Sequence, residues 1–456
     1  MHPMHPVPPS VPFLLFVLVS LAEGVGAVSA APTIDERARR EDLVQYRQQV
    51  FAPDRAFDAA ASREAALQRL AALEARRGEM DTLAFGLELA RITALADNGH
   101  SMSYAAPRLQ RSNRVEIRLV PFGQEFHVLR TREADADLLG ARLRAIDGVP
   151  LPRLREAAHS LAGGLPAWRD RQAPALFESP QQLFALGLVA APEAALYRFQ
   201  HADGRVVERR LVADPPHETR ARGTSDRLLL PEVLPPELGW RAVLPAAQAP
   251  WSLLDAGRRF RWRHDAALDA LVVEMRAARD QPGEPLPPFF DAVREALATH
   301  KPRHMVLDLR LNGGGDLTRT RDFAEQLPTL VPGRLFVLTS PWTFSAAIST
   351  AGYLKQAAPA RVAVVGEPVG DRLEFFAEGR PVRLKHSGEV LLPATERHDY
   401  ADGCRRFSDC HGPVVSRPIR VATLAPDVAA AWTFEAYRAG IDPAMQAVAR
   451  ALAGRE

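Results

Sequence analysis

The sequence predicts an α/β protein of two or three domains, and three observations lead to this fold class. Residues 34–96 repeat leucine and other apolar residues at three- and four-residue spacing among charges, which indicates helices. Short alternating runs between residues 115 and 212 indicate strands, and strand and helix then alternate from residue 257 to 365. A chain of 456 residues, 47% hydrophobic and 25% charged, is long enough for that organisation.

The charge balance excludes some classes of partner. The net charge is +2, and no basic block with interleaved aromatic residues is present, so we expect no nucleic-acid partner. Lysine occurs only at positions 301, 355 and 385, and arginine supplies the remaining positive charge. A reaction that needs a lysine base therefore has few candidates.

The first thirty residues predict an export signal. Val11–Leu21 is an apolar stretch, and Ala27-Val28-Ser29-Ala30 offers small residues for cleavage. This predicts a mature chain that begins near Ala31, in the periplasm or secreted, with no stable membrane span after cleavage. The apolar run is short for a membrane helix, although an uncleaved anchor is the alternative.

Two cysteines, Cys404 and Cys410, lie close together in the chain. In an exported protein they predict a local disulfide, and two unconnected thiols are the alternative.

We expect the following domains. After the signal at 1–30, a helical cap covers residues 31–110 and ends in the turn Asp97–Ser101, which carries His100. A β-rich domain covers 111–215, although its residues 165–190 look like linkers or irregular loops. Residues 216–256 look like a linker, and residues 257–456 form the α/β domain.

The stretch from 303 to 349 is the most informative. Met305–Leu311 is an apolar run that stops at three glycines, and Leu335–Thr339 is a second run that leads to Ser345 and a series of small residues. Strand, tight turn and helix start expose backbone N–H groups and a hydroxyl at a sheet edge. An acyl-transfer enzyme would have its nucleophile, Ser345, and its oxyanion hole at such a place, with Gly313, Gly314 and Ala346 as donors. The alternative is that Ser345 only caps the helix.

These motifs carry a resemblance. DLRLNGGGD, TSPWTFSAA and RVAVVGEPVG, in that order, resemble the serine peptidases of the tail-specific (carboxyl-terminal processing) family, which includes the tricorn core. The resemblance implies a crotonase/Clp-like core of ββα units, a PDZ-like domain at 111–215 and a peptide or protein substrate. An unrelated β-rich insertion is the alternative to the PDZ-like domain.

The resemblance also bears on the general base. One branch of the family uses a lysine in a G-E-x-T-x-G-K-like stretch, but here that stretch ends in Arg372, which does not deprotonate in proteins. Lys355 lies about 15 Å along the helix from Ser345, out of reach. The tricorn-like branch uses a histidine from before the PDZ-like domain, and His100 matches that place.

The third catalytic residue is the least determined. Glu367 matches the family's G-E pair, and Asp399 and Asp402 lie where the tricorn-like branch has a glutamate. We select Glu367, and we expect Asp308 and Asp316 to orient the glycine loop that they flank.

The sequence thus predicts an exported serine peptidase that acts through an acyl-enzyme, with Ser345, His100 and Glu367 as catalytic residues. No cofactor or metal is expected, since the chain lacks GK[ST], HExxH and paired CxxC motifs. A non-catalytic ligand- or peptide-binding protein on the same scaffold is the alternative, and the oligomeric state stays open.

Overall fold

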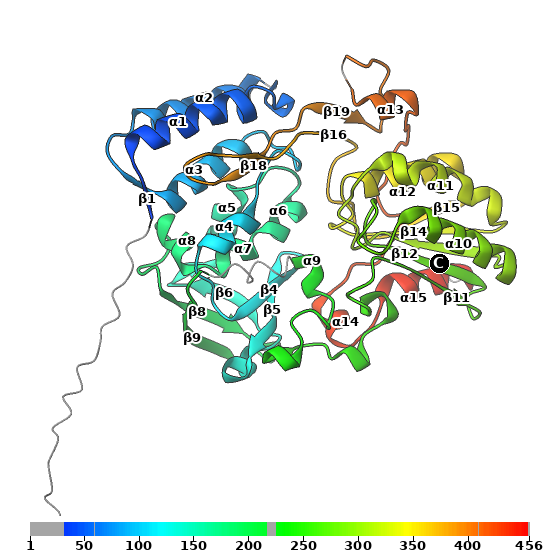
Figure 1. Ribbon diagram of the computed structural model, residues 1–456. Helices are drawn as coiled ribbons and strands as arrows, with labels where there is room; N and C mark the ends of the chain where they lie inside the picture. Colours follow the sequence, from blue (N-terminus) through cyan, green and yellow to red (C-terminus); the bar gives the residue numbers. More distant parts are fainter. Residues whose placement is uncertain (1–31, 59, 217–224, 409, 455–456) are drawn as a thin grey trace, which may run out of the picture.

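The computed structural model describes residues 32–58, 60–216, 225–408 and 410–454. The predicted signal at 1–30 lies outside these residues. Figure 1 shows N-terminal helices above one sheet and, across from both, a second sheet covered by helices. None of the helices in the described ranges is long and apolar enough to cross a membrane.

A six-stranded sheet forms the centre of the C-terminal part. Its order is β11-β12-β13-β14-β15-β20, with β11 and β12 antiparallel and all later neighbours parallel. Parallel neighbours need crossover connections, which the helices between them supply. The mixed α/β fold expected from the sequence is therefore present. The strands are β11 (Phe260–Asp265), β12 (Ala270–Met275), β13 (His304–Asp308), β14 (Leu335–Thr339), β15 (Val362–Gly366) and β20 (Val428–Ala429).

Helices cover both faces of this sheet because successive strand residues point to opposite sides. Leu307 and Val337 pack with α10, α11 and α12 in one core, whereas Val306 and Phe336 pack with α15 in another. The helices of this part are α10 (Leu286–His300), α11 (Leu317–Leu330), α12 (Ala346–Ala357), α13 (Gly412–Ser416), α14 (Phe434–Arg438) and α15 (Pro443–Leu452).

The N-terminal part is helical. Its core is built around Leu43, Tyr46, Phe57 and Phe85. The side chain of Asp81 caps α3 by accepting a hydrogen bond from Ala84 N–H. The elements are β1 (Thr33–Ile34), α1 (Glu36–Tyr46), the π-helical turn η1 (Arg47–Phe51), the 3₁₀ turn η2 (Arg55–Asp58), α2 (Ala60–Ala75), β2 (Met80–Asp81), α3 (Thr82–Ala94), β3 (Met102–Ser103) and α4 (Ala105–Arg111).

A separate antiparallel sheet follows, in the order β10-β5-β6-β8-β9, with β4 paired to β5 and β7 to β6. It has a core of its own, to which Phe126, Leu143 and Phe199 belong. The strands are β4 (Ile117–Phe122), β5 (Glu125–Arg132), β6 (Arg142–Ile146), β7 (Val149–Pro150), β8 (Ala194–Gln200), β9 (Val206–Val212) and β10 (Trp240–Ala242); the 3₁₀ turn η3 (Glu133–Leu138) and helix α5 (Leu151–His159) lie between them.

The expectation of irregular loops at 165–190 is wrong. This stretch forms α6 (Pro166–Gln172), α7 (Pro174–Phe177) and α8 (Pro180–Ala185), and each helix begins with proline. Proline is favoured at the first helical position because its missing N–H would have no partner there. The prolines that suggested loops therefore start helices.

Residues 216–256 do not form a free linker where the structure describes them. Leu229, Leu244 and Leu253 are buried in a core shared with Trp432 and Tyr437 from near the chain end. This segment contains α9 (Ser225–Leu228), the 3₁₀ turns η5 (Pro236–Leu238), η6 (Ala246–Gln248) and η7 (Trp251–Leu253), and β10. Its apolar residues have no helix or strand period, which is why the sequence did not show their burial.

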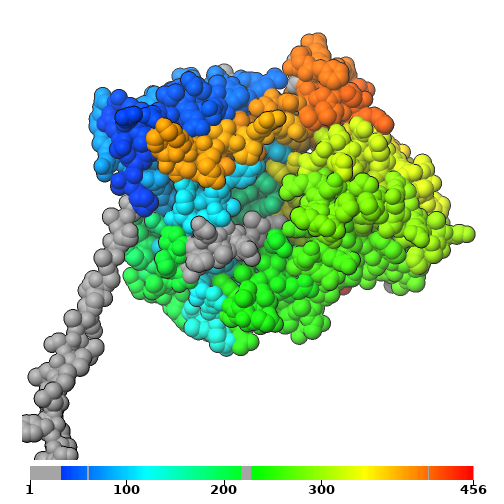
Figure 2. All heavy atoms as spheres, viewed as in Figure 1, coloured from blue at the N-terminus to red at the C-terminus, as the bar shows by residue number. Residues whose placement is uncertain are grey.

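A late segment, residues 374–399, returns to the N-terminal part. It contains β16 (Glu374–Ala377), β17 (Val382–Arg383), β18 (Val390–Leu392) and β19 (Glu396–Asp399), and β18 pairs with β3. Figure 2 shows this segment, in orange, lying against the N-terminal helices in blue. The pairing with β3 brings the turn that carries His100 toward the α/β part.

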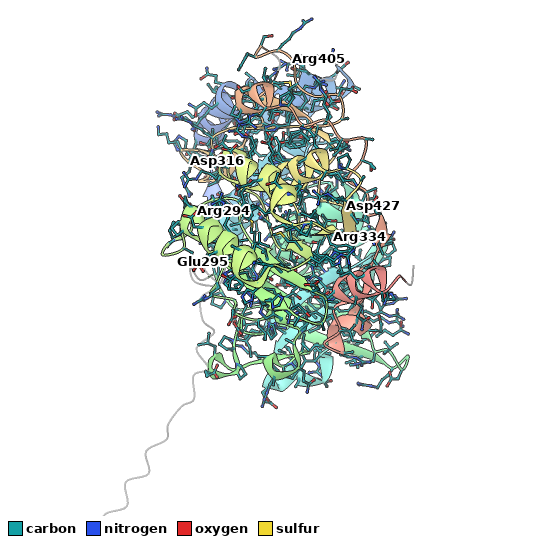
Figure 3. The ribbon with its side chains drawn as sticks, turned by 90° about the vertical axis from the view of Figure 1, so that its right-hand side faces the viewer. Arg294, Glu295, Asp316, Arg334, Arg405 and Asp427 are labelled. Atoms are coloured by element: carbon teal, nitrogen blue, oxygen red, sulfur yellow. A yellow bond between two sulfur atoms is a disulfide. The ribbon has the colours of Figure 1, made fainter. Side chains whose placement is uncertain are left out.

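The predicted disulfide is confirmed, because Cys404 and Cys410 are bonded. Figure 3 places Arg405, inside the disulfide loop, at one end of the molecule, and Asp316 lies below it at the start of α11.

Candidate active site

Ser345 lies between β14 and α12 in an unusual backbone conformation. Its φ is 55° and its ψ is −128°, outside the regions that a residue with a side chain normally adopts. The side chain makes no capping hydrogen bond to α12, although Ser345 occupies the N-cap position. Strain of this kind costs about 1–3 kcal/mol and is concentrated at functional sites. The role of simple helix cap therefore finds no support in the geometry.

The turn that carries Ser345 is bonded to the end of β13. Phe344 N–H donates to the carbonyl of Asn312 at 3.0 Å, and the Thr343 hydroxyl donates to the carbonyl of Leu309 at 2.9 Å. These bonds hold the serine turn against the glycine loop.

The glycine loop has no room for side chains at its centre. A Cβ on Gly314, whose φ is 99°, would lie 2.5 Å from Ser345 Cβ, and one on Gly315 would lie 2.6 Å from the Ala278 carbonyl oxygen. Gly314 N–H already donates to Asn312 Oδ1 at 2.9 Å. By contrast, within the described ranges the N–H groups of Gly313 and Ala346 have no acceptor. Two of the three predicted oxyanion donors are thus available, and the Gly314 amide is in use.

The two aspartates that flank the loop hold its ends. Asp308 pairs with Arg310, 2.6 Å between Oδ2 and Nη2, and Arg310 also binds Asp442. Asp316 accepts a hydrogen bond from Thr318 N–H and caps α11. Neither side chain bonds to a glycine of the loop among the described residues, so the orienting role stays a prediction.

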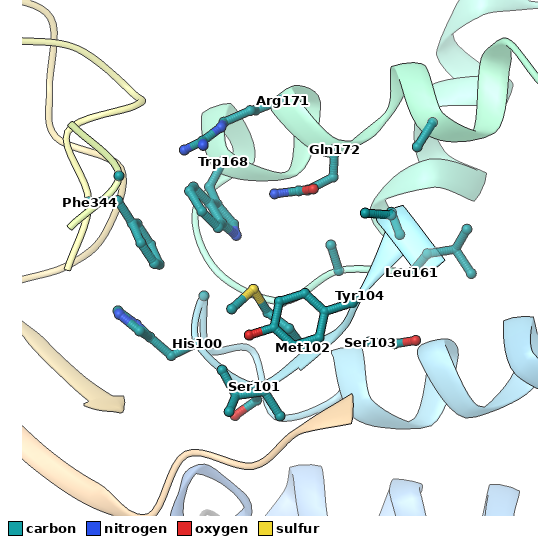
Figure 4. A pocket seen from close by; sticks show the side chains of 18 of the residues that line it. His100, Ser101, Met102, Ser103, Tyr104, Leu161, Trp168, Arg171, Gln172 and Phe344 are labelled. Atoms are coloured by element: carbon teal, nitrogen blue, oxygen red, sulfur yellow. The ribbon is translucent and has the colours of Figure 1, made fainter. Parts of the chain in front are cut away.

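His100 is buried between aromatic rings. Its ring centroid lies 4.3 Å from that of Phe344 and 4.9 Å from that of Phe375. Figure 4 shows the His100 ring near Phe344, which in turn stacks on Trp168. Because Phe344 directly precedes Ser345, this stacking holds the imidazole at the serine turn. In the described part of the chain, neither Nδ1 nor Nε2 of His100 makes a hydrogen bond.

Asp371 lies behind the histidine. Its Oδ2 is 3.3 Å from His100 Nδ1, and the Asp371 side chain is fully buried. Arg372 N–H donates to the other carboxylate oxygen at 2.9 Å. Only glycine fits at position 99, because a Cβ there would lie 2.9 Å from Asp371 Oδ2. Sequence reasoning missed Asp371, although it directly follows the motif RVAVVGEPVG that carried the resemblance.

Glu367, the acid selected from the sequence, lies elsewhere. Its Oε2 accepts a hydrogen bond from Trp432 N–H at 3.3 Å, and it lines a separate small cavity with Trp342. Burial raises the pKa of the Glu367 carboxyl. No contact joins Glu367 to His100 among the described residues.

Asp399 and Asp402, the alternatives, are also away from the imidazole. Asp399 accepts hydrogen bonds from the N–H groups of Ala401 and Asp402, which closes a turn after β19, and its other oxygen pairs with Arg397 at 2.9 Å.

Lys355, Lys385 and Arg372 have structural partners in the fold. Lys355 Nζ donates to the Val362 carbonyl and to Asp427, and Lys385 pairs with Glu41. Arg372, at the place of the family's lysine, donates to the carbonyl and the carboxylate of Asp97, both at 2.8 Å. The described lining of the candidate site contains no lysine.

Ser345 and His100 open into one cavity of about 560 Å³ between the α/β part and the other two parts. Its walls combine apolar side chains such as Met102, Leu161 and Trp168 with the guanidinium of Arg279. This volume is within the range of small-molecule and peptide side-chain sites. The arrangement can bind an extended apolar segment next to a serine hydroxyl, a buried imidazole and two unbonded N–H groups.

A second cavity of about 410 Å³ lies on the other side of Ser345. Glu378, His398 and His411 line it, and their ligand atoms all lie within 4.8 Å of one another. Burial lowers the pKa of His398. The hydrogen bond to Glu378 raises it, but by less. These three side chains could hold a metal ion.

Comparison with known proteins gives a likeness in fold. No family profile and no curated protein match the chain. Mature CPAF in complex with lactacystin is similar over 91% of this chain and 98% of its own, with 12% identity and a TM-score of 0.54. A second structure of mature CPAF has a TM-score of 0.52, again with 12% identity, over 91% and 97% of the two chains.

The photosystem II D1 C-terminal processing protease is also among the matches, with 14% identity over 91% of this chain and 97% of that one and a TM-score of 0.39. The likeness to CPAF extends over nearly the whole of both chains and concerns the fold. CPAF fits the tail-specific, carboxyl-terminal processing serine peptidases that the sequence motifs resemble.

Proposed function

We propose that the chain is an exported serine peptidase that hydrolyses peptide bonds through an acyl-enzyme. The observation that carries the proposal is the strained Ser345, which faces a cavity shared with His100 and adjoins two unbonded amides. The likeness in fold to CPAF agrees with this function.

In the proposed reaction, His100 Nε2 accepts the proton of the Ser345 hydroxyl while Oγ attacks the substrate carbonyl carbon. The N–H groups of Ala346 and Gly313 donate to the oxyanion. Collapse of the tetrahedral intermediate breaks the C–N bond, and His100 returns the proton to the leaving amine. Water then attacks the ester in the same way and regenerates the serine.

Asp371 takes the role for which Glu367 was selected from the sequence. The Asp371 carboxylate faces Nδ1 of His100, where it would hold the ring and stabilise the imidazolium. In the free protein the two atoms lie 3.3 Å apart, within ion-pair distance, but no hydrogen bond joins them. Catalytic hydrogen bonds are often loose without substrate and tighten in the complex.

The proposal includes the finer organisation expected from the sequence. The α/β part is a crotonase/Clp-like ββα core, the antiparallel sheet is a PDZ-like domain, and the N-terminal helices form a cap. The apolar stretch before Ala31 exports the chain to the periplasm or beyond. Among the described strands β9 pairs only with β8, and the N–H and C=O groups on its other side suit addition of an extended peptide, which supports a peptide or protein substrate.

The apolar lining of the larger cavity favours a second candidate, a binding protein without catalysis on the same scaffold. A fluorophosphonate probe separates the two, since it requires an activated serine. We expect stable labelling of the wild type and none of Ser345→Ala, while Ser416→Ala, an exposed serine on α13, labels normally. Failure to label the folded wild type would favour the binding protein.

A further inference from the structure

Three side chains with metal-ligating atoms converge beside Ser345. Glu378 follows β16, His398 lies in β19, and His411 follows the disulfide. His398 Nε2 is 3.1 Å and His411 Nε2 is 3.9 Å from Glu378 Oε1. Donor atoms bound tetrahedrally at about 2.0–2.2 Å from one ion lie about 3.3–3.6 Å apart, so small side-chain movements would bring all three donors within bonding distance of one ion.

The other nitrogen of each imidazole already has a partner. His411 Nδ1 lies 2.7 Å from Glu396 Oε2, and His398 Nδ1 lies 2.9 Å from the Tyr400 hydroxyl. The Tyr400 hydroxyl is in turn 2.6 Å from Ser349 Oγ. With Nδ1–H as donor in each ring, both Nε2 lone pairs point toward Glu378. Such partners fix the tautomer and the orientation of metal-binding histidines.

The backbone positions the three groups before any ion binds. The β16–β19 ladder pairs Phe375 with His398, which leaves Glu378 just beyond the pairing. His411 N–H donates to the Arg397 carbonyl at 2.9 Å, next to His398, and the disulfide closes the loop that precedes His411. His398 is buried, whereas Glu378 is about 36% exposed, so an ion can enter from one side.

We propose that Glu378, His398 and His411 form a binding site for a divalent transition-metal ion of the Zn²⁺ class. Two imidazoles and one carboxylate suit Zn²⁺. They do not suit Ca²⁺ or Mg²⁺, because these ions prefer a set of oxygen ligands only. Three protein ligands leave one position of a tetrahedral ion for water, facing the cavity that Ser345 also lines. No zinc motif is visible in the sequence, because the three ligands come from separate segments.

This site does not depend on peptidase activity. Phe375 separates the two sets of groups: its ring stacks on His100 at 4.9 Å on one side and on His398 at 4.8 Å on the other. Metal binding can therefore be measured on the full chain whether or not the chain hydrolyses peptides.

Titration with Co²⁺, followed by its visible ligand-field absorption and then by displacement with Zn²⁺, tests the site. We expect one equivalent with the intense absorption of a four- or five-coordinate ion, and loss of that absorption in Glu378→Gln and in His411→Ala. Glu396→Gln, which removes only the charged partner of His411, should weaken binding roughly 10- to 100-fold. His386→Ala is the matched control, because His386 pairs with Glu41 at 2.8 Å but no third ligand joins this pair among the described residues.

Glu378 is the most informative substitution because its side chain is partly exposed, so its loss should leave the fold intact by circular dichroism. Two results would overturn the proposal: a folded wild type that gives only the spectrum of hydrated Co²⁺ and retains no Zn²⁺, or Co²⁺ and Zn²⁺ affinities that are unchanged in folded Glu378→Gln and His411→Ala.

Discussion

Replacement of Asp371 by asparagine tests the charge behind His100 with little change of shape. At 3.3 Å, and with an effective dielectric constant of about 20, a carboxylate and an imidazolium attract each other by about 5 kcal/mol. The imidazolium forms as Ser345 loses its proton, so the transition state would lose most of this energy. At about 1.4 kcal/mol per factor of ten, we expect a roughly 10³- to 10⁴-fold slower reaction.

The second-order rate of fluorophosphonate labelling at Ser345 measures this effect without a known substrate. Glu367→Gln is the matched control, because it also removes one buried carboxylate near the sheet edge but none that contacts the imidazole. Its labelling rate should stay within a few-fold of the wild type. Thermal unfolding should show that both variants are folded.

The reverse pattern would refute the assignment. If Glu367→Gln abolished labelling while Asp371→Asn kept most of it, Glu367 would be the third catalytic residue. The contact between Asp371 and His100 would then have no catalytic role.

Three further predictions concern the loop, the pH dependence of stability and the disulfide. Gly314→Ala should abolish labelling and lower the free energy of unfolding by about 1–3 kcal/mol more than Gly283→Ala, which has a similar positive φ but no neighbour, and equal losses in urea unfolding would contradict this. Burial raises the pKa of Asp54 to about 7, against a hydrogen bond from Ser101. The folded state thus binds this proton more tightly, and its contribution is present below about pH 4 and lost as pH rises through about 7. Asp54→Asn should therefore gain up to roughly 4 kcal/mol relative to the wild type between these limits, whereas a pH-independent difference would contradict the assignment. Reduction of the Cys404–Cys410 disulfide should weaken Co²⁺ binding about tenfold or more, because it frees the loop before His411, and unchanged affinity in the reduced, folded protein would contradict this.

The parts of the site that lie close together in the sequence could be predicted from it. The glycine loop follows one strand and Ser345 follows the next strand along the chain, so local spacing alone predicts that the two lie side by side. His100 needed the resemblance, because nothing local distinguishes it from a solvent-exposed turn. Asp371 could not be chosen over Glu367, since which of two carboxylates in one loop faces inward depends on contacts from elsewhere.

Those contacts are visible at Gly370 and Arg372. Gly370 N–H donates to the Thr343 carbonyl at 2.8 Å, and a Cβ at this glycine would lie 2.4 Å from the Pro341 carbonyl oxygen. Arg372 then binds Asp97 in the turn of His100. The long-range pairing, and not the motif, turns Asp371 toward the imidazole.

The turn that carries His100 is held by all parts of the fold. Asp97 pairs with Arg372 of the α/β part on one side and with Arg169 of α6 on the other. Gly164, before α6, lies close to Gly99: a Cβ on Gly164 would be 2.9 Å from the Cα of Gly99. Trp168 of α6 stacks on Phe344 at 3.7 Å, beside Ser345.

Since Ser345 and His100 belong to different parts, any movement of α6 or β18 relative to the second sheet changes their separation. The site is therefore complete only while these parts are docked, and local opening at the β3–β18 pairing would uncouple the base from the serine without unfolding either core.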